Sequence, residues 1–475
     1  MKSGSIGCII AFALMMHALP AAAAAASAVA GDGEARFRAL HRGLVETNTS
    51  LSDGSCTIAA DMVRTKLLAA GYAENATRVI IAPDFPKQGN LFAELPGSDP
   101  KAAPILLLAH LDVVEAKRAD WQRDPFKLVE ENGFLYGRGV VDDKAMAASF
   151  VDAFIRFREM GFKPRHTLKL ALTCGEETYE TFNGVSYILK TYPKLLSAGL
   201  AINEGGNGTL DANGKPLVFG IESGEKTYQD FKLVTTSPGG HSAVPGKDNA
   251  ITRLANGLAK IGAYRFAASV GPITRTYFAR SASLHLGQVG ADMRMIGNGM
   301  VDEAVLTRIS EASPLWNAML RTTCVATMVT AGQAPNAMAQ RAEADVNCRI
   351  LPDQSVDAVR AKLLEVVADP TLDVSLASTA APVSPAPPLT PDILGPVERI
   401  VARMWPGVPV IPNLLPAGTD GRFLMAAGIP TYGISGVFRD PDGDGVHGLN
   451  ERVRVKSLID SRNFLYELIT NLSSH

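Results

Sequence analysis

The feature that most restricts the fold is a series of short apolar segments, each followed directly by polar residues. Residues 105–109 form a continuous apolar run, residues 168–173 are a mostly apolar segment, and residues 200–202 are a shorter apolar run. Such runs are typical of strands that are buried on both faces of a sheet. Residues 143–158 carry apolar side chains at helical spacing between the first two runs. This alternation predicts an α/β fold in which helices flank a mixed central sheet.

Six polar clusters follow these segments or lie in loops further along the chain. They are His110-Leu111-Asp112, Asp142-Asp143-Lys144, Gly175-Glu176-Glu177, Asn203-Glu204-Gly205-Gly206, Gly239-Gly240-His241-Ser242 and His447-Gly448-Leu449-Asn450-Glu451. Ligands bind at the carboxyl ends of strands in open α/β sheets, so most of these side chains are expected to meet at one edge. Two imidazoles with several carboxylates are a ligand set for two Zn²⁺ ions, with one carboxylate left for proton transfer. Co²⁺ and Mn²⁺ accept similar ligands.

The pattern changes near residue 225. Residues 229–236 alternate like a half-exposed strand, and two further strands are expected on either side of Ala334-Pro335-Asn336. With helices near 248–262 and 355–368, the order strand-helix-strand-strand-helix-strand predicts a ferredoxin-like α+β domain. A Pro/Ala/Ser-rich linker follows, and the later residues return to the first domain. The expected organisation is a catalytic domain over 32–224 and 380–475, with a lid or dimerisation domain, 225–379, inserted into it.

The N-terminus predicts export. Lys2 precedes an apolar run over residues 6–19, and Pro20 and an alanine-rich tract come next. This is typical of a secretory signal peptide, expected over residues 1–26. A membrane anchor is the alternative, but the run is shorter than the ~18 residues that a spanning helix needs. We therefore expect a secreted or periplasmic protein without a stable membrane anchor. The net charge is −2 with no basic stripe, so nucleic acid is not an expected partner.

Four cysteines follow the expected cleavage site. Cys174 lies inside an apolar strand, where we expect a buried thiol. Cys324 and Cys348 each lie twelve residues from Asn336, so a hairpin centred there would place them opposite each other. Because exported proteins keep disulfides, this register predicts a Cys324–Cys348 bond. Cys56 has no assigned partner.

The six clusters together resemble those of the zinc metallohydrolases that include aminoacylases, glutamate carboxypeptidase and succinyl-diaminopimelate desuccinylase. The resemblance covers essentially all of the chain after the signal peptide. It implies a two-zinc catalytic domain with an inserted lid that often pairs with a second copy. One departure is Ala145, since the family usually has glycine after the lysine that corresponds to Lys144.

The resemblance also implies a role for each member of the clusters. His110 and Glu204 would bind one metal ion, Glu177 and His447 the other, and Asp142 would bridge the two. Asp143 is the competing candidate for the bridge, although it also suits the first turn of a helix. Asp112 would accept the spare ring N–H of His110 and fix its tautomer. Glu176 would be the general base.

Further residues are candidates for substrate binding. His241 would polarise the scissile carbonyl as an oxyanion-hole donor, and we expect it to serve the active site of a partner subunit. Asn336 and Arg349 match family positions that hold the substrate, although turn and salt-bridge roles would also account for them. Gly418 and Thr419 would bind a substrate carboxylate, with a plain turn as the alternative.

The sequence therefore predicts an exported two-zinc hydrolase that cleaves a peptide or N-acyl amide bond next to a free carboxylate. Its substrate would be a small peptide or an N-acyl amino acid, and the lid would form a homodimer. A dipeptidase or aminopeptidase of the same family is the alternative, but those relatives more often have aspartate at the position of Glu204. A binding protein without catalysis is a further alternative, which the intact Glu176 and ligand set disfavour.

Overall fold

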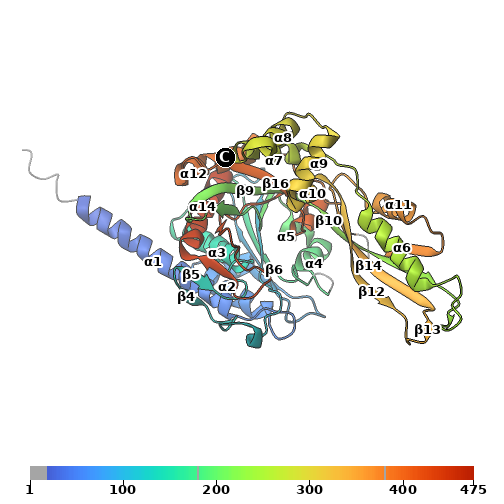
Figure 1. Ribbon diagram of the computed structural model, residues 1–475. Helices are drawn as coiled ribbons and strands as arrows, with labels where there is room; N and C mark the ends of the chain where they lie inside the picture. Colours follow the sequence, from blue (N-terminus) through green and yellow to red (C-terminus); the bar gives the residue numbers. More distant parts are fainter. Residues whose placement is uncertain (1–18, 179–180, 379–380, 475) are drawn as a thin grey trace, which may run out of the picture.

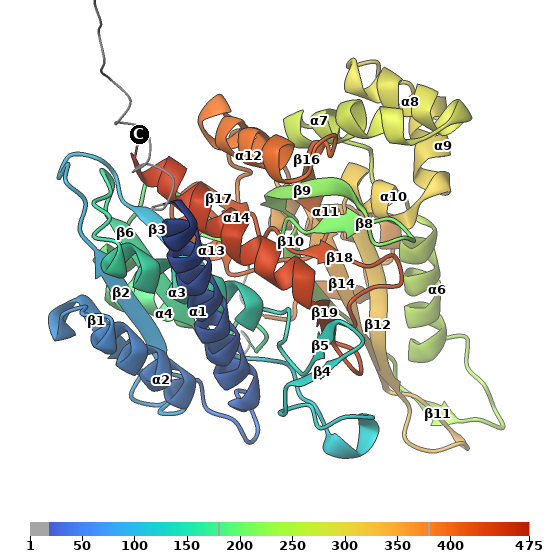
Figure 2. The same ribbon diagram turned by 90° about the vertical axis from the view of Figure 1, so that its left-hand side faces the viewer.

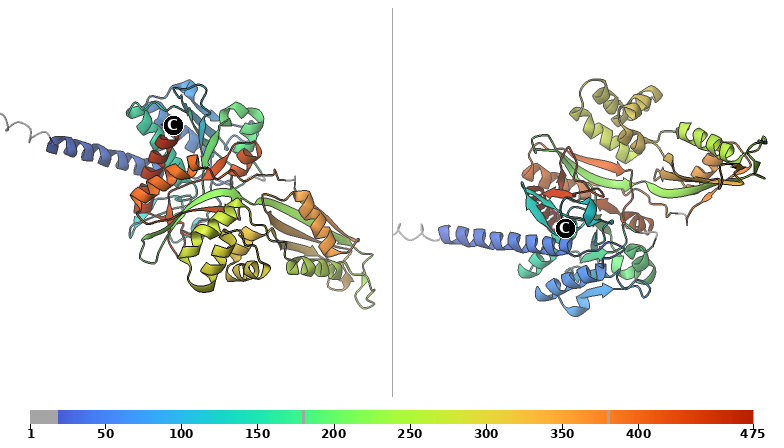
Figure 3. Two further views of the ribbon diagram at one scale, coloured as in Figure 1. Left: turned by 90° about the horizontal axis from the view of Figure 1, so that it is seen from above. Right: turned by 60° about the horizontal axis from the view of Figure 1, so that its bottom comes forward.

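The computed structural model describes residues 19–178, 181–378 and 381–474 and shows a larger body with an elongated lid extending from it (Figure 1). Helix α1 (Leu19–Glu46) projects from the opposite side of the body (Figures 1 and 3). Most of the predicted signal peptide lies outside the described residues, so it stays a prediction. Within the described ranges, no helix is both long and apolar enough to cross a bilayer.

A mixed sheet forms the centre of the body. Its described strands are β1 (Thr77–Ile80), β2 (Asn90–Leu95), β3 (Ile105–His110), β6 (Leu168–Thr173), β7 (Leu200–Asn203), β8 (Gly208–Leu210), β9 (Pro216–Glu225), β16 (Val410–Leu415), β17 (Thr431–Gly433) and β18 (Phe438–Arg439). Their order is β1-β2-β6-β3-β7-β17-β9-β8-β18, and β16 pairs with β9. Strand β3 is parallel to both β6 and β7. The polar clusters that follow these three strands therefore lie along one edge of the sheet.

Helices cover both faces of this sheet (Figure 2). On one face lie α1, α2 (Cys56–Ala69), α3 (Lys144–Glu159), α12 (Pro391–Met404) and α14 (Val455–Ser474), and on the other α4 (Gly184–Thr191), α5 (Pro193–Leu196) and α13 (Gly421–Ala426). Alternate residues of β3 serve the two cores: Leu107 packs into the first, and Leu106 and Leu108 pack into the second. The predicted strand with two buried faces is confirmed.

The lid contains a four-stranded antiparallel sheet, in the order β12-β14-β10-β15. The strands are β10 (Thr227–Thr236), β12 (Thr323–Ala331), β14 (Arg341–Ile350) and β15 (Leu372–Leu376), and helices α6 (Ala250–Ala263) and α11 (Val356–Val367) pack against them. The short strands β11 (Gly240–His241) and β13 (Ala337–Met338) pair at the outer tip (Figures 1 and 2). This is the predicted strand-helix-strand-strand-helix-strand order. Cys324 lies opposite Cys348 and is bonded to it, so the predicted disulfide is confirmed.

A helical segment interrupts this pattern between α6 and β12, where no elements were predicted. It contains α7 (Pro272–Ser281), a 3₁₀ turn (Ala282–Leu284), α8 (Gly287–Gly297), α9 (Glu303–Ala312) and α10 (Pro314–Leu320). We call residues 272–320 the helical segment. It has a hydrophobic cluster of its own, and α7 also packs against β16 of the body. These residues thus lie within the lid's sequence but contact the catalytic sheet. The predicted domain boundaries stay a prediction.

A small three-stranded sheet brings two distant loops together. It consists of β4 (Val129–Glu131), β5 (Phe134–Tyr136) and β19 (Arg452–Arg454), with β5 in the middle. Strand β5 precedes the loop that carries Asp142, and β19 follows the loop that carries His447. Their antiparallel pairing therefore holds the two loops side by side.

Candidate metal centre

Asp142 lies between the two imidazoles of the site. The distance from its Oδ1 to Nε2 of His110 is 3.0 Å, and the distance from its Oδ2 to Nε2 of His447 is 3.2 Å. Each carboxylate oxygen therefore faces a different imidazole, which is the arrangement that a carboxylate bridging two ions needs. The Asp143 carboxyl is buried and belongs to neither of the described groups that could hold a metal at this edge. The geometry favours Asp142 as the bridging ligand.

Two glutamates complete a symmetric arrangement around Asp142. Nε2 of His110 is 3.6 Å from Oε2 of Glu204, and Nε2 of His447 is 2.9 Å from Oε1 of Glu177. One ligand atom each of His110, Asp142 and Glu177 lies within 4.8 Å of the others. His110, Glu204 and Glu176 form a second group with the same spacing. The structure thus brings together the five predicted ligands and the predicted general base.

Asp112 organises both sides of this centre. Its carboxylate accepts hydrogen bonds from the backbone N–H groups of Glu176 (3.3 Å) and Glu177 (3.0 Å). Nδ1 of His110 lies 3.0 Å from the main-chain oxygen of Asp112 and 3.7 Å from its carboxylate. The closer contact is the main-chain oxygen, so that oxygen accepts the ring N–H and leaves Nε2 to face the metal site. The carboxylate mainly holds the turn that presents the two glutamates.

Glu451 positions the loop that carries Asp142. Its buried carboxylate accepts hydrogen bonds from the backbone N–H groups of Gly139, Val141 and Asp142, at 2.9, 2.9 and 3.2 Å. The Arg138 guanidinium donates to it at 2.9 Å. Hydrogen-bonding groups that surround a metal site in this way fix the direction of a metal-binding side chain. Glu451 belongs to the last predicted cluster but had no predicted role; its place four residues after the candidate ligand His447 was the available signal.

The His447 loop is strained and firmly tied. His447 has a φ of +59°, which costs a non-glycine residue of order 1–3 kcal/mol. The next residue, Gly448, accepts a hydrogen bond from Arg138 at 2.7 Å, and its N–H donates to Gly445. The Arg138 side chain therefore contacts both Gly448 and Glu451, so one residue supports the two loops on which Asp142 and His447 lie.

Burial and neighbouring charges shift the pKa values of the carboxyl groups and imidazoles at this site. Burial raises the pKa of Glu176 well above its usual value, and the nearby Glu204 carboxylate raises it further. Burial acts in the same direction on Asp142, but hydrogen bonds with the two imidazoles hold its pKa well below the usual range. Hydrogen bonds to Asp142 and Glu177 raise the pKa of His447 to about 10. For His110, burial lowers the pKa, but Glu204 and Asp142 outweigh it and raise the pKa well above normal.

A cavity of about 670 Å³ opens from the metal centre. Gly418 and Thr419, the predicted carboxylate binders, line it. The N–H and hydroxyl of Thr419 already donate to the buried Glu225 carboxylate, which stands where a substrate carboxylate was expected. Arg439, which was not among the predicted site residues, also lines the cavity, with its Nε 2.7 Å from Asp444.

The three predicted lid residues lie outside this cavity, whose described lining includes none of them. His241 is exposed in β11, and its Nδ1 accepts the N–H of Ala243. Asn336 lies beside it, since its main-chain oxygen accepts the N–H of Ser242. The Arg349 guanidinium stacks over the Tyr228 ring at 4.5 Å. The substrate roles of these three residues stay predictions.

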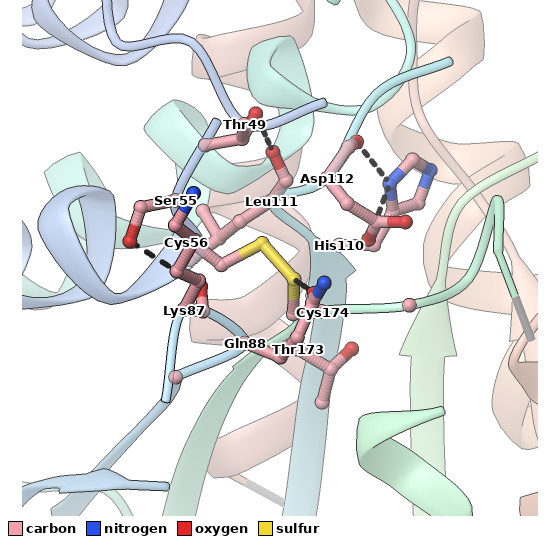
Figure 4. Close-up of a disulfide and its surroundings, with 12 residues drawn as sticks. Thr49, Ser55, Cys56, Lys87, Gln88, His110, Leu111, Asp112, Thr173 and Cys174 are labelled. Atoms are coloured by element: carbon pink, nitrogen blue, oxygen red, sulfur yellow. Dashed lines mark hydrogen bonds and ion pairs between the residues drawn. A yellow bond between two sulfur atoms is a disulfide. The ribbon is translucent and has the colours of Figure 1, made fainter. Parts of the chain in front are cut away.

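A second disulfide joins Cys56 to Cys174, so the expectation of a thiol at Cys174 was wrong. Cys56 begins α2, and Cys174 directly precedes the Gly175-Glu176-Glu177 turn. Figure 4 shows the bond next to Asp112, and one carboxylate oxygen of Asp112 lies within 4.8 Å of both sulfurs. The partner is 118 residues away in the chain, and no sequence pattern links the two positions.

Comparison with known proteins identifies the family. Residues 106–471 match Peptidase family M20/M25/M40. This span covers most of the chain, so the chain belongs to this family of metal-dependent hydrolases. The N-fatty-acyl-amino acid synthase/hydrolase PM20D1.1 of Danio rerio is 30% identical over 388 residues, which are 79% of this chain and 73% of the relative.

Solved structures show the same fold. The M20 family metallo-carboxypeptidase Sso-CP2 from Sulfolobus solfataricus superimposes with a TM-score of 0.64 at 17% identity, over 92% of this chain and 99% of that one. YXEP from Bacillus subtilis, a dinuclear metal binding peptidase from the M20 family, gives a TM-score of 0.59 at 13% identity, over 93% and 98%. The predicted fold class and family resemblance are confirmed.

Zinc affinity should rise steeply with pH. Because the pKa of each ligand imidazole is raised, the metal-free protein holds protons on His110 and His447 at neutral pH. Each zinc ion must displace one of these protons, so the affinity for each ion should rise about tenfold per pH unit around pH 7, and the product of the two binding constants about a hundredfold. Calorimetric zinc titration in buffers of different ionisation enthalpy counts the protons. An affinity that does not change with pH would contradict this description of the site.

Loss of the Cys56–Cys174 bond should weaken metal binding. The bond ends next to the Glu176-Glu177 turn, so its removal loosens two groups that Asp112 holds. We expect the Cys56→Ser/Cys174→Ser variant to bind zinc about 10–100-fold more weakly, which is the usual effect of losing a group that orients metal ligands. Cys324→Ser/Cys348→Ser is the matched control, because it removes a disulfide in the lid. Both variants should lose thermal stability. Equal zinc affinity in the two would show that the first disulfide does not support the site.

Proposed function

We propose that this member of peptidase family M20/M25/M40 is an exported two-zinc amidohydrolase that releases an amino acid from an N-acyl amino acid. The observation that carries the proposal is the position of Asp142 between two imidazoles, each with a glutamate beside it. Each half of the site offers one imidazole nitrogen and carboxylate oxygens. Such a donor set fits zinc and leaves coordination positions for substrate. Zinc ions bound there would polarise the amide carbonyl and lower the pKa of water.

Glu176 is the residue proposed to move the proton. It adjoins the His110–Glu204 half, while the neighbouring Glu177 pairs with His447. Its backbone is held by Asp112, so its carboxyl has a defined position. A carboxylate held beside the metal site can take a proton from the attacking water and then give it to the leaving amine.

The acyl group is proposed to be a long apolar chain. The Danio rerio relative is named as an N-fatty-acyl-amino acid synthase/hydrolase. The cavity beside the metal centre supports the same substrate class, because leucines, two methionines and other apolar side chains line much of it. A carboxypeptidase acting on peptides is the second candidate, favoured by the family name. The substrates of both reactions carry a free carboxylate next to the scissile amide.

The proposal also includes export of the protein and pairing of two copies through the lid. Two disulfides suit an oxidising compartment outside the cytosol. The lid's edge strand β12 exposes Val325, Met328 and Val329, and an exposed apolar edge favours pairing with another strand. We propose that a second copy of the chain covers this edge and that His241, remote from its own cavity, serves the site of the partner.

Two adjacent substitutions test the catalytic assignment. Glu176→Ala should abolish release of amino acid from N-acyl amino acids while about two zinc ions stay bound, because Glu176 moves protons. Glu177→Ala should lose zinc. Mass spectrometry of the amino acid product and metal analysis of the protein give both results. Release of amino acids from dipeptides but from no N-acyl amino acid would contradict the proposed substrate, and equal zinc loss in both variants would contradict the roles.

Mixing two inactive variants tests the partner role of His241. After subunit exchange, Glu176→Ala and His241→Ala chains form mixed dimers in which one site has both an intact Glu176 and the partner's intact His241. About a quarter of wild-type activity should return for random pairing and independent sites. No recovered activity, in a protein that sedimentation shows to be dimeric, would place the function of His241 within its own chain or outside catalysis.

A further inference from the structure

We propose that the helical segment, residues 272–320, and the catalytic sheet together form the binding site for the acyl chain of the substrate. This inference rests on the proposed function, since it names the place where an unbranched aliphatic chain lies when its amide is at the metal centre. Its support is the composition and position of the cavity walls.

The cavity runs from the metal centre to the helical segment. Asp142, Glu176, Glu204 and His447 line the metal end. The sheet contributes Leu217 and Val218 from β9 and Ile411 and Leu414 from β16, and the helical segment contributes Tyr277, Leu284, Leu315 and Met319. A volume of about 670 Å³ falls within the ordinary range for small-molecule sites. The cavity therefore has one charged end and one apolar end.

Exposed leucines mark the apolar end as a binding surface. Leu217, Leu284 and Leu315 have 48%, 38% and 50% of their surface exposed and come from three separate elements, yet all line this cavity. Apolar side chains that gather around a hollow are typical of ligand sites. Met319 and Leu414, by contrast, are almost fully buried and pack together in one cluster. Core packing thus fixes the positions of Met319 and Leu414, while the three exposed leucines face solvent until a ligand covers them.

The chemistry of this wall selects an aliphatic chain over the charged end of the substrate. The helical segment presents no lysine or arginine among its described lining residues. The Tyr277 hydroxyl already accepts a hydrogen bond from Trp316 at 3.0 Å, and the His285 ring packs edge-on against Trp316. A carboxylate placed there would lose its water without gaining a cation, which is costly. A hydrocarbon chain placed there has no charge to desolvate, and it covers the exposed leucines.

Burial of hydrocarbon gives the expected size of the effect. Each methylene moved from water into an apolar site changes an equilibrium or rate constant about fourfold. The ratio kcat/KM should therefore rise with acyl length from acetyl upwards and level off when the chain fills the cavity. A short acyl group would leave the apolar end of the cavity empty, so its kcat/KM would not benefit from the burial of methylenes.

Two matched substitutions on the helical segment test the site. Leu315→Asp puts a charge on the cavity wall, and Leu286→Asp puts the same charge on a residue that is 94% exposed and does not line the cavity. Both positions lie at helix N-termini, since Leu315 is the second residue of α10 and Leu286 is the N-cap of α8. Aspartate is favourable at such positions, so both variants should fold.

The measured quantity is the ratio of kcat/KM for an N-dodecanoyl amino acid to that for the N-acetyl amino acid. The wild type should strongly favour the long chain. Leu315→Asp should lower the ratio by about tenfold or more, because the chain would have to desolvate a charge, and Leu286→Asp should keep the wild-type ratio. A wild-type ratio near one, or a ratio that Leu315→Asp leaves unchanged, would overturn the assignment.

Binding measurements separate this inference from the proposed function. Calorimetry on the Glu176→Ala variant, with and without Leu315→Asp, compares N-dodecanoyl and N-acetyl glycine. If the wild type hydrolyses neither compound but tighter binding of the long chain depends on Leu315, the proposed function fails and the acyl site stands. If both compounds are hydrolysed but bind equally well, the acyl site is wrong and the amidohydrolase activity stands.

Discussion

Partly or fully buried carboxylates gather at the edge of the sheet where β3, β6 and β7 end, and their mutual repulsion constrains the structure around them. Two like charges ~4 Å apart repel by about 4 kcal/mol at the effective dielectric constant of a protein site. Burial raises the pKa of Glu204 to about 7, while two imidazoles keep Asp142 ionised. Divalent cations would offset this repulsion, and the symmetric approach of His110 and His447 to Asp142 leaves a place for one on each side.

The surrounding structure holds these groups in place by contacts from distant parts of the chain. Asp112 binds the backbone of the two glutamates, and Glu451 binds the backbone of the Asp142 loop. The Cys56–Cys174 bond ties α2 to the strand that presents Glu176. Each tie joins segments far apart in sequence, so the centre forms when the catalytic domain is folded around it. The substrate-facing walls come from elsewhere, with the helical segment on one side of the cavity and the sheet on the other.

Local pattern predicted most of the fold because the relevant signals are local. The apolar run before His110 and the alternation over 229–236 are strands, and the position of Cys324 and Cys348 about Asn336 gave the correct hairpin register. The Cys56–Cys174 bond depends on tertiary packing alone and has no local signature. The helices of the helical segment are short and separated by glycine and proline, so their periodicity is weak. The contact between Glu225 and Thr419 likewise joins residues 194 positions apart.

The central claim is that Asp142 bridges two metal ions at this edge. The most direct test is anomalous diffraction at the zinc absorption edge from crystals of the zinc-loaded protein. Two peaks about 3.5–4 Å apart are expected, with one Asp142 oxygen on each ion, His110 and Glu204 on one ion and Glu177 and His447 on the other. A single peak, or two peaks with Asp142 bound to one of them or to neither, would contradict it.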